Sequence, residues 1–193
     1  MTPTETALDV SSTPDIHDRV TEAYFGNLGP EFARSTRDRV HWICSQVEGP
    51  NILDVGCSQG IAAILLGRES NTVLGIDSDE RSVQEANNYL AKESERVRQA
   101  VTIICGDLLT HDFGDRRFDT VIMAEVLEHL IQPQRFLQTA AQLLKDHGRL
   151  IITVPFGVND WPDHKQTFYL QEPWNLISAH FSIEGATIIG KWI

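Results

Sequence analysis

Short, continuously apolar runs alternate along this chain with longer stretches in which apolar residues recur every three or four positions. The short runs predict buried strands, and they fall at residues 51–55, 72–76, 101–105, 118–123 and 148–154. The longer stretches predict helices, and they fall at residues 61–68, 78–92 and 133–145. Strands that are apolar throughout must be covered on both faces. The alternation therefore predicts an α/β fold with a doubly wound, mostly parallel sheet and helices on both faces.

The segments on either side of this alternation extend the prediction. Residues 15–47 predict one or two helices, with a break where two glycines and a proline follow one another closely. Residues 1–14 are polar and acidic and predict a disordered lead, which leaves one domain over residues 15–193. A helix near residues 171–179 and a strand within residues 181–193 complete the domain. That last strand lacks a following partner strand, which suggests a domain cut from a longer protein.

Candidate ligand contacts follow three consecutive predicted strands. The turn from Asp54 to Gly60 carries glycines, which let the backbone approach a ligand, and the next helix offers unpaired N–H groups. Asp77 ends the second strand about 20 residues later, where a carboxylate can accept hydrogen bonds from ribose hydroxyls. Asp107 follows the third strand, where an acid can accept from an adenine amino group. Because parallel strands end at one edge of a sheet, these residues predict a nucleoside-containing cofactor at that edge.

Four stretches, taken in order, resemble the motifs of class I S-adenosylmethionine (SAM)-dependent methyltransferases, which have a Rossmann-like fold. They are LDVGCSQG at residues 53–60, GIDSD at 75–79, GDLL at 106–109 and FDTVIMAEVLEHL at 118–130. The resemblance covers about residues 40–193 and implies SAM as the cofactor and S-adenosylhomocysteine (SAH) as the product. A nicotinamide-binding dehydrogenase is disfavoured, because GxxxG in the first turn differs from the dinucleotide fingerprint GxGxxG.

The resemblance also implies which part of the cofactor each motif contacts. The methionine part would contact Gly56, Cys57, Ser58 and Gly60, and Asp54 would support their loop. The ribose would contact Asp77 and Ser78, and the adenine would contact Asp107 and Leu108. The sulfonium would lie near Ala124 and Glu125. Methyl transfer itself requires an aligned nucleophile and, for some acceptors, removal of a proton. No catalytic residue is universal in this family, so a base must be sought locally.

The stretch EVLEH at residues 125–129 is the first candidate for such local chemistry. Glu125, Glu128 and His129 offer carboxylate and imidazole ligands to a divalent cation such as Mg²⁺, and His129 is also a candidate base. Similar ExxEH patterns in small-molecule O-methyltransferases and in a group of RNA 3′-end methyltransferases are associated with metal binding, although the RNA group carries more histidines. The alternative is that Glu128 and His129 only support the following loop and helix.

The segment after the fifth predicted strand is the second candidate, because loops at this end of the sheet commonly carry function. It is rich in turn-forming and aromatic residues and would line the acceptor pocket, with His164 as a candidate base. The alternative is that Trp161 and His164 only pack a surface loop. Near the N-terminus, Tyr24, Phe25 and Arg34 either close over the cofactor or take part in ordinary amphipathic packing.

Charge and cysteine content narrow the choice of partners and compartment. A net charge of −11 opposes phosphate binding, and the arginines within residues 34–39 and 96–98 are interpreted as solvated helix faces rather than a nucleic-acid patch. Three separated cysteines lack metal-ligand spacing and predict reduced, mostly buried thiols in the cytoplasm. No apolar run is long enough for a membrane-spanning helix, and the N-terminus lacks the features of a secretory signal.

These features predict an enzyme that transfers a methyl group from SAM to an oxygen of a small molecule or a sugar. The ExxEH pattern favours oxygen, whereas the acidic charge and the incomplete histidine pattern count against RNA. The alternatives are an RNA or protein methyltransferase and a SAM-binding domain of a larger fused enzyme that is inactive alone.

Overall fold

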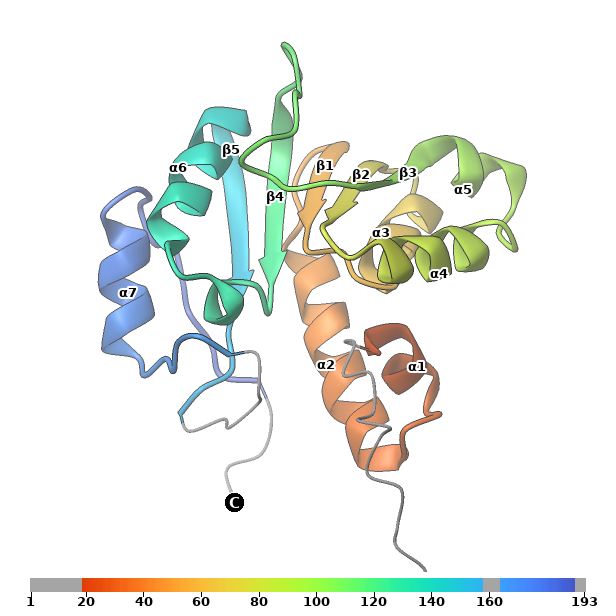
Figure 1. The fold of residues 1–193 in the computed structure, drawn as a ribbon, viewed down its shortest axis with the longest axis horizontal. Coiled ribbons are helices and arrows are strands. Elements are labelled where there is room, and N and C mark those ends of the chain that lie inside the picture. The colour runs from red at the N-terminus through yellow and green to blue at the C-terminus, as the bar shows by residue number, and fades with distance from the viewer. Residues whose placement is uncertain (1–18, 158–163, 190–193) are drawn as a thin grey trace, which may run out of the picture.

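A computed structural model describes residues 19–157 and 164–189 of the 193-residue chain. Its centre is a five-stranded sheet in the order β3-β2-β1-β4-β5, in which neighbouring strands pair in parallel. The strands are β1 (Asn51–Val55), β2 (Thr72–Asp77), β3 (Val101–Cys105), β4 (Phe118–Ala124) and β5 (Leu144–Thr153). The predicted α/β fold is therefore confirmed (Figure 1). The lead expected at residues 1–14 lies outside the described residues.

The strand order places the change of winding direction beside β1. From β1 the chain builds β2 and β3 on one side and then β4 and β5 on the other, which makes the sheet doubly wound. Val55 at the end of β1 pairs with Ile76 of β2 and Met123 of β4, so these three strands end at the same edge. In Figure 1 this edge faces α1 and α2. Ligands of such sheets bind at the carboxyl edge, where the winding reverses.

The described helices largely follow the expected pattern. They are α1 (Val20–Phe25), α2 (Pro30–Gln46), α3 (Ile61–Arg68), α4 (Glu80–Leu90), α5 (Glu95–Ala100), the 3₁₀ helix η1 (Leu127–His129), α6 (Pro133–Leu143) and α7 (Gln171–Ser178). Gly26, in the left-handed region at φ 91°, ends α1, and Pro30 begins α2. The Asp79 side chain accepts a hydrogen bond from the Ser82 amide at 2.8 Å and thereby caps the start of α4. The short helices α5 and η1 were not predicted.

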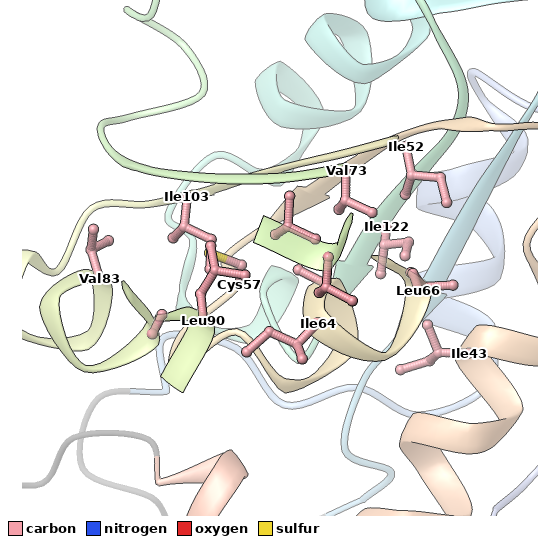
Figure 2. Close-up of a cluster of buried hydrophobic side chains, with 14 of the residues drawn as sticks. Ile43, Ile52, Cys57, Ile64, Leu66, Val73, Val83, Leu90, Ile103 and Ile122 are labelled. Carbon is pink, nitrogen blue, oxygen red and sulfur yellow. The ribbon is translucent and has the colours of Figure 1, made fainter. Parts of the chain in front are cut away.

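Hydrophobic clusters fill both faces of the sheet. The first cluster lies between one face and helices α2 to α5, and its members include Ile43, Ile52, Cys57, Leu66, Leu90 and Val97 (Figure 2). The second lies between the other face and α6, and its members include Leu53, Met123, Leu137 and Leu143. The neighbours Ile52 and Leu53 of β1 thus enter opposite clusters, as side chains of a strand covered on both faces must.

The junction between α6 and β5 differs from the prediction of a helix to residue 145 and a strand from residue 148. The helix ends at Leu143 and the strand begins at once with Leu144. Leu144 pairs with Phe118 of β4, and a shift in register follows before the regular ladder resumes. Pairing with β4 therefore decides this boundary, and local sequence preference does not record such long-range pairing.

The strand expected within residues 181–193 is absent from residues 181–189, the part of that range that the structure describes. This segment contacts β5 through side chains, because Arg149 Nη2 lies 2.8 Å from Glu184 Oε2. Helix α7 before it buries none of its residues. Within the described residues, the sheet therefore ends at β5.

The three cysteines are free thiols, but they differ in burial. Cys57 is buried and Cys44 is partly buried, whereas Cys105 is exposed, so the expectation of mostly buried thiols is wrong for Cys105. Burial raises the pKa of the Cys44 thiol to about 12 and that of Cys57 well above its usual range. Among the described residues, no helix is long and apolar enough to cross a membrane.

Candidate functional site

The loop between β1 and α3 requires glycine at two positions. Gly56 has φ +68°, and a Cβ there would lie 2.6 Å from Val126 Cγ2. Gly60 has φ +77°, and a Cβ there would lie 2.9 Å from Ile103 Cδ1. Conformation and packing thus both disfavour a larger side chain at these two positions, and Gly56 is partly exposed at the carboxyl edge whereas residues 57–60 are buried. We refer to residues 56–60 as the cofactor loop.

Asp77, at the end of β2, holds two loops together. Its Oδ2 accepts a hydrogen bond from the Ser58 amide at 2.7 Å, and its Oδ1 accepts one from the Asp79 amide at 2.9 Å. A carboxylate oxygen can accept two hydrogen bonds, so each oxygen of Asp77 can also accept one from a hydroxyl group of a ligand. The carboxylate therefore fixes the cofactor loop against the start of α4 and remains suited to bind ribose.

Asp54 lies inside the protein rather than in the site. It is 3% exposed, and this burial raises the pKa of its carboxyl group to about 7, with a further rise caused by the negative charge of Asp77. Burial keeps this carboxyl group away from direct contact with solvent, and its support of the following loop stays a prediction.

The remaining predicted cofactor residues divide into core and surface positions. The side chain of Cys57 packs in the first hydrophobic cluster and that of Leu108 in the second, so both stabilise the loops from below. Ser78 and Asp107 are exposed, and Asp107 Oδ1 accepts a hydrogen bond from the Leu109 amide at 2.7 Å. Ala124 packs partly buried against the first cluster.

One residue of the cofactor loop was missed by sequence reasoning. Gln59 is 1% exposed, and its side chain connects α1 with α4 through hydrogen bonds to Thr21 and Glu85. No signal in the sequence indicates this role, because the partners lie 38 and 26 residues away.

Glu125 follows β4 in the left-handed region, at φ +54°. Its Oε1 accepts a hydrogen bond from the Thr153 hydroxyl at 2.8 Å, and its Oε2 lies 3.2 Å from Arg39 Nη1. The carboxylate thus joins the ends of β4 and β5 to helix α2. Both of its oxygens are directed to these partners.

A cluster of potential metal ligands lies beside this point. One ligand atom each from Glu128, His129 and His164 lies within 4.8 Å of the other two. We refer to these three residues as the cation cluster. The sequence predicted Glu128 and His129 for this role together with Glu125, and the structure adds His164, which no local spacing could indicate. Glu125 is not a member.

Backbone contacts explain how His164 reaches η1. The amides of Lys165 and Gln166 both donate to the Glu128 carbonyl, at 2.7 and 3.1 Å. The imidazole rings of His129 and His164 consequently meet edge to face, with centroids 4.9 Å apart. Trp161, the other residue considered in this segment, lies outside the described residues.

The N-terminal candidates differ in their contacts. Tyr24 Oη and His41 Nε2 are 2.8 Å apart, and Arg37 donates to the Tyr24 carbonyl at 2.7 Å. The side chain of Phe25 is half exposed, and Arg34 is exposed on α2. The two arginine clusters are largely occupied by protein acceptors, as Arg37, Arg39, Arg96 and Arg98 illustrate.

Comparison with known proteins gives one family match and a set of relatives. Residues 53–152 match the family described as "Methyltransferase domain". The ubiquinone biosynthesis O-methyltransferase of Caulobacter sp. (strain K31) is 28% identical over 174 residues, which cover 75% of this chain and 67% of that protein. The protein of the same name from Coxiella burnetii (strain Dugway 5J108-111) is 31% identical over 117 residues, which cover 60% of this chain. The chain spans about half, 48%, of that relative.

Solved structures support the fold. The [4+2]-cyclase SpnF matches with a TM-score of 0.66 at 18% identity, over 78% of this chain and 59% of its own. The glycopeptide N-methyltransferase MtfA in complex with SAM matches with a TM-score of 0.57 at 15% identity, over 62% of this chain and 50% of its own. These neighbours differ in their reactions, so the likeness describes the architecture alone.

Proposed function

This chain belongs to the methyltransferase domain family, and we propose that it transfers the methyl group of SAM to an oxygen atom of a small molecule, leaving SAH. The observation that carries this proposal is the meeting of the cofactor loop, Asp77 and the cation cluster at the carboxyl edge of one sheet. The names of the relatives, which are O-methyltransferases of ubiquinone biosynthesis, favour oxygen over nitrogen or carbon.

The cofactor half of the proposal follows the order of the strands. We assign the methionine part to the cofactor loop at the partly exposed Gly56, and the ribose hydroxyls to the Asp77 carboxylate. Asp107, with Ser78 and Leu108 nearby in sequence, is assigned to the adenosine end. Ala124 and Glu125, at the end of β4, then lie on the side of the sulfonium. This assignment places the methyl group toward β4 and β5.

A divalent cation fits the residues on that side. One carboxylate and two imidazoles form a donor set that suits Zn²⁺, Mn²⁺ or Fe²⁺ better than Mg²⁺, which prefers oxygen ligands. Their proximity within 4.8 Å is compatible with a shared ion after small side-chain rotations. Glu125 would join them only by leaving Arg39 and Thr153. When bound, the cation supplies Lewis-acid stabilisation of an acceptor oxygen.

The chemistry of the transfer makes modest demands on the chain. The acceptor hydroxyl loses its proton, its oxygen forms a bond to the methyl carbon, and the carbon–sulfur bond breaks with its electrons returning to sulfur. The protein holds the two reactants in line, which accounts for most of the rate gained in such reactions. We assign removal of the proton to His129 or His164, whichever does not bind the cation, because one imidazole nitrogen cannot hold a metal ion and a proton at the same time.

The alternatives differ in acceptor and in completeness. A sugar hydroxyl fits the same chemistry, whereas RNA is disfavoured by the net charge of −11 and by arginines that bind within the protein. A protein acceptor, or a SAM-binding domain that needs further sequence to act, has no specific support in the described residues. We place the protein in the cytoplasm, which the three free thiols favour and which cell fractionation would test.

Calorimetric titration with SAH, with NAD as the comparison, tests the cofactor. We expect SAH alone to bind, and failure to bind it would overturn the proposed function. Turnover is then measured with methyl-labelled SAM and panels of phenols, sugars, RNA and protein. Labelling confined to RNA or protein would overturn the small-molecule acceptor.

Titration with Zn²⁺ and Mn²⁺ tests the cation cluster independently of turnover. We expect His164→Ala to reduce cation affinity at least tenfold. His180→Ala is the matched control, because His180 follows α7 and is not a member of the cluster. Equal cation affinity in both variants would exclude the cation cluster and leave the methyltransferase assignment intact.

A further inference from the structure

We infer that Gln59 is a positioning residue for the cofactor and that helix α1, through Thr21, belongs to the cofactor site. This inference rests on the proposed binding of SAM at the cofactor loop. It goes further by naming what holds that loop in its binding shape. Gln59 is not expected to touch the reacting atoms, since its side chain is directed into the protein and is 1% exposed.

Three hydrogen bonds connect Gln59 to two helices, α1 and α4. Its Oε1 accepts a hydrogen bond from the Thr21 amide at 3.0 Å, and its Nε2 donates to Glu85 Oε2 at 2.6 Å. Its carbonyl accepts from the Thr21 hydroxyl at 3.1 Å. Thr21 is itself 1% exposed. The two bonds between Gln59 and Thr21 join groups almost completely removed from water, so they have well-defined geometry and are expensive to lose, whereas the bond to Glu85 is only partly buried.

The loop needs such external support because its own backbone is strained. Ser58, which precedes Gln59, has φ +46°, an unfavourable region for a residue with a Cβ. Gly60, which follows it, has φ +77°. Gln59 therefore sits between two residues in the left-handed region, which glycine adopts readily and serine does not, so the strain lies at Ser58. The bonds from Thr21 and Glu85 hold this conformation in place.

Holding the loop in advance affects binding. A loop that is already ordered loses less conformational freedom when its ligand arrives, so affinity rises without any new contact. Ordering of α1 and occupancy of the loop must then favour each other reciprocally. Helix α1 is suited to this coupling because it is also attached to α2, where Tyr24 meets His41 and Arg37.

The test compares variants of the full chain by SAH calorimetry, with thermal unfolding measured in parallel. Thr21→Val removes the hydroxyl donor to the Gln59 carbonyl and keeps the shape, and we expect SAH affinity to fall about fivefold, as loss of one buried hydrogen bond implies. Thr21→Ser, which keeps the hydroxyl, is expected to recover most of that loss. Thr36→Val makes the same change in a buried threonine of α2 that does not bond to Gln59, and it serves as the control.

A second measurement follows the coupling directly. Hydrogen exchange of the Thr21 amide should slow at least fivefold when wild-type protein is saturated with SAH, and this protection should be lost in Gln59→Ala. If Thr21→Val and Thr36→Val lower the melting temperature alike and neither changes SAH affinity, Gln59 has only a structural role and the inference fails. If wild-type protein does not bind SAH, the proposed function fails first, and the two failures are thereby distinguished.

Discussion

Replacement of Asp54 by asparagine is predicted to change how stability depends on pH. The carboxyl pKa is 3.8 in the reference state and about 7 in the folded protein, because burial and the charge of Asp77 oppose ionisation. A folded state with the higher pKa binds a proton that the unfolded chain has released. The resulting stabilisation is complete below pH 3.8, declines as pH rises, and disappears above about pH 7.

The magnitude follows from the two pKa values. pH 5.5 lies roughly 1.5 units below the folded-state pKa of Asp54, and each unit corresponds to about 1.4 kcal/mol. Protonation of Asp54 therefore stabilises the folded state by about 2 kcal/mol at this pH. At pH 8.5 the carboxylate is ionised in both states and contributes nothing to this difference. Wild-type protein should therefore lose about 2 kcal/mol between these pH values through Asp54 alone, and Asp54→Asn should not.

Urea unfolding followed by tryptophan fluorescence measures this quantity. The free energy of unfolding is determined for wild type and Asp54→Asn at pH 5.5 and pH 8.5, and the difference of differences removes the titration of all other groups. Asp115→Asn, at an exposed carboxylate, is the control for a general charge effect. A double difference below about 0.5 kcal/mol would refute the reasoning, because Asp54 would then be as easily ionised inside the protein as in the unfolded chain.

Three further substitutions test the site and the core. Gly56→Ala should abolish SAH binding and destabilise the fold by about 1–3 kcal/mol, because its Cβ would lie 2.6 Å from Val126 Cγ2 at φ +68°; wild-type affinity would show that the loop adapts. Asp77→Asn should weaken SAH binding at least tenfold in calorimetry, since a charged acceptor is lost, and unchanged affinity would remove it from the ribose site. Leu137→Ala, at a fully buried position, should lower the free energy of unfolding by about 2–5 kcal/mol in urea and leave SAH affinity unchanged.

The sequence determined the architecture because each strand can be recognised from the apolar character of its own residues. The runs that became β1 to β4 are predominantly apolar and place apolar side chains on both faces of the sheet, so they need a layer of helix on each side. The glycines at positions 56 and 60 and the acid at position 77 could be placed at the carboxyl edge for the same reason, since parallel strands end together. These features depend on residues close to one another in the chain.

Contacts between residues far apart in the chain could not be predicted from the local sequence. His164 lies beside His129 because the amides of Lys165 and Gln166 donate to the Glu128 carbonyl, and no spacing rule connects segments so far apart. The prediction of Glu125 as a metal ligand followed a local pattern and overlooked Arg39 on α2, which only the fold brings within 3.2 Å.

The cofactor loop shows the same difference between what the local sequence determines and what tertiary contacts determine. The local sequence determined that a glycine-containing turn follows β1, because backbone conformation is largely a local property. Tertiary structure alone decided what holds that turn in shape, because Thr21 and Glu85 meet Gln59 only after α1 and α4 have packed against the rest of the fold. Buried hydrogen bonds form between whichever groups the packing brings together, and packing is a property of the whole chain.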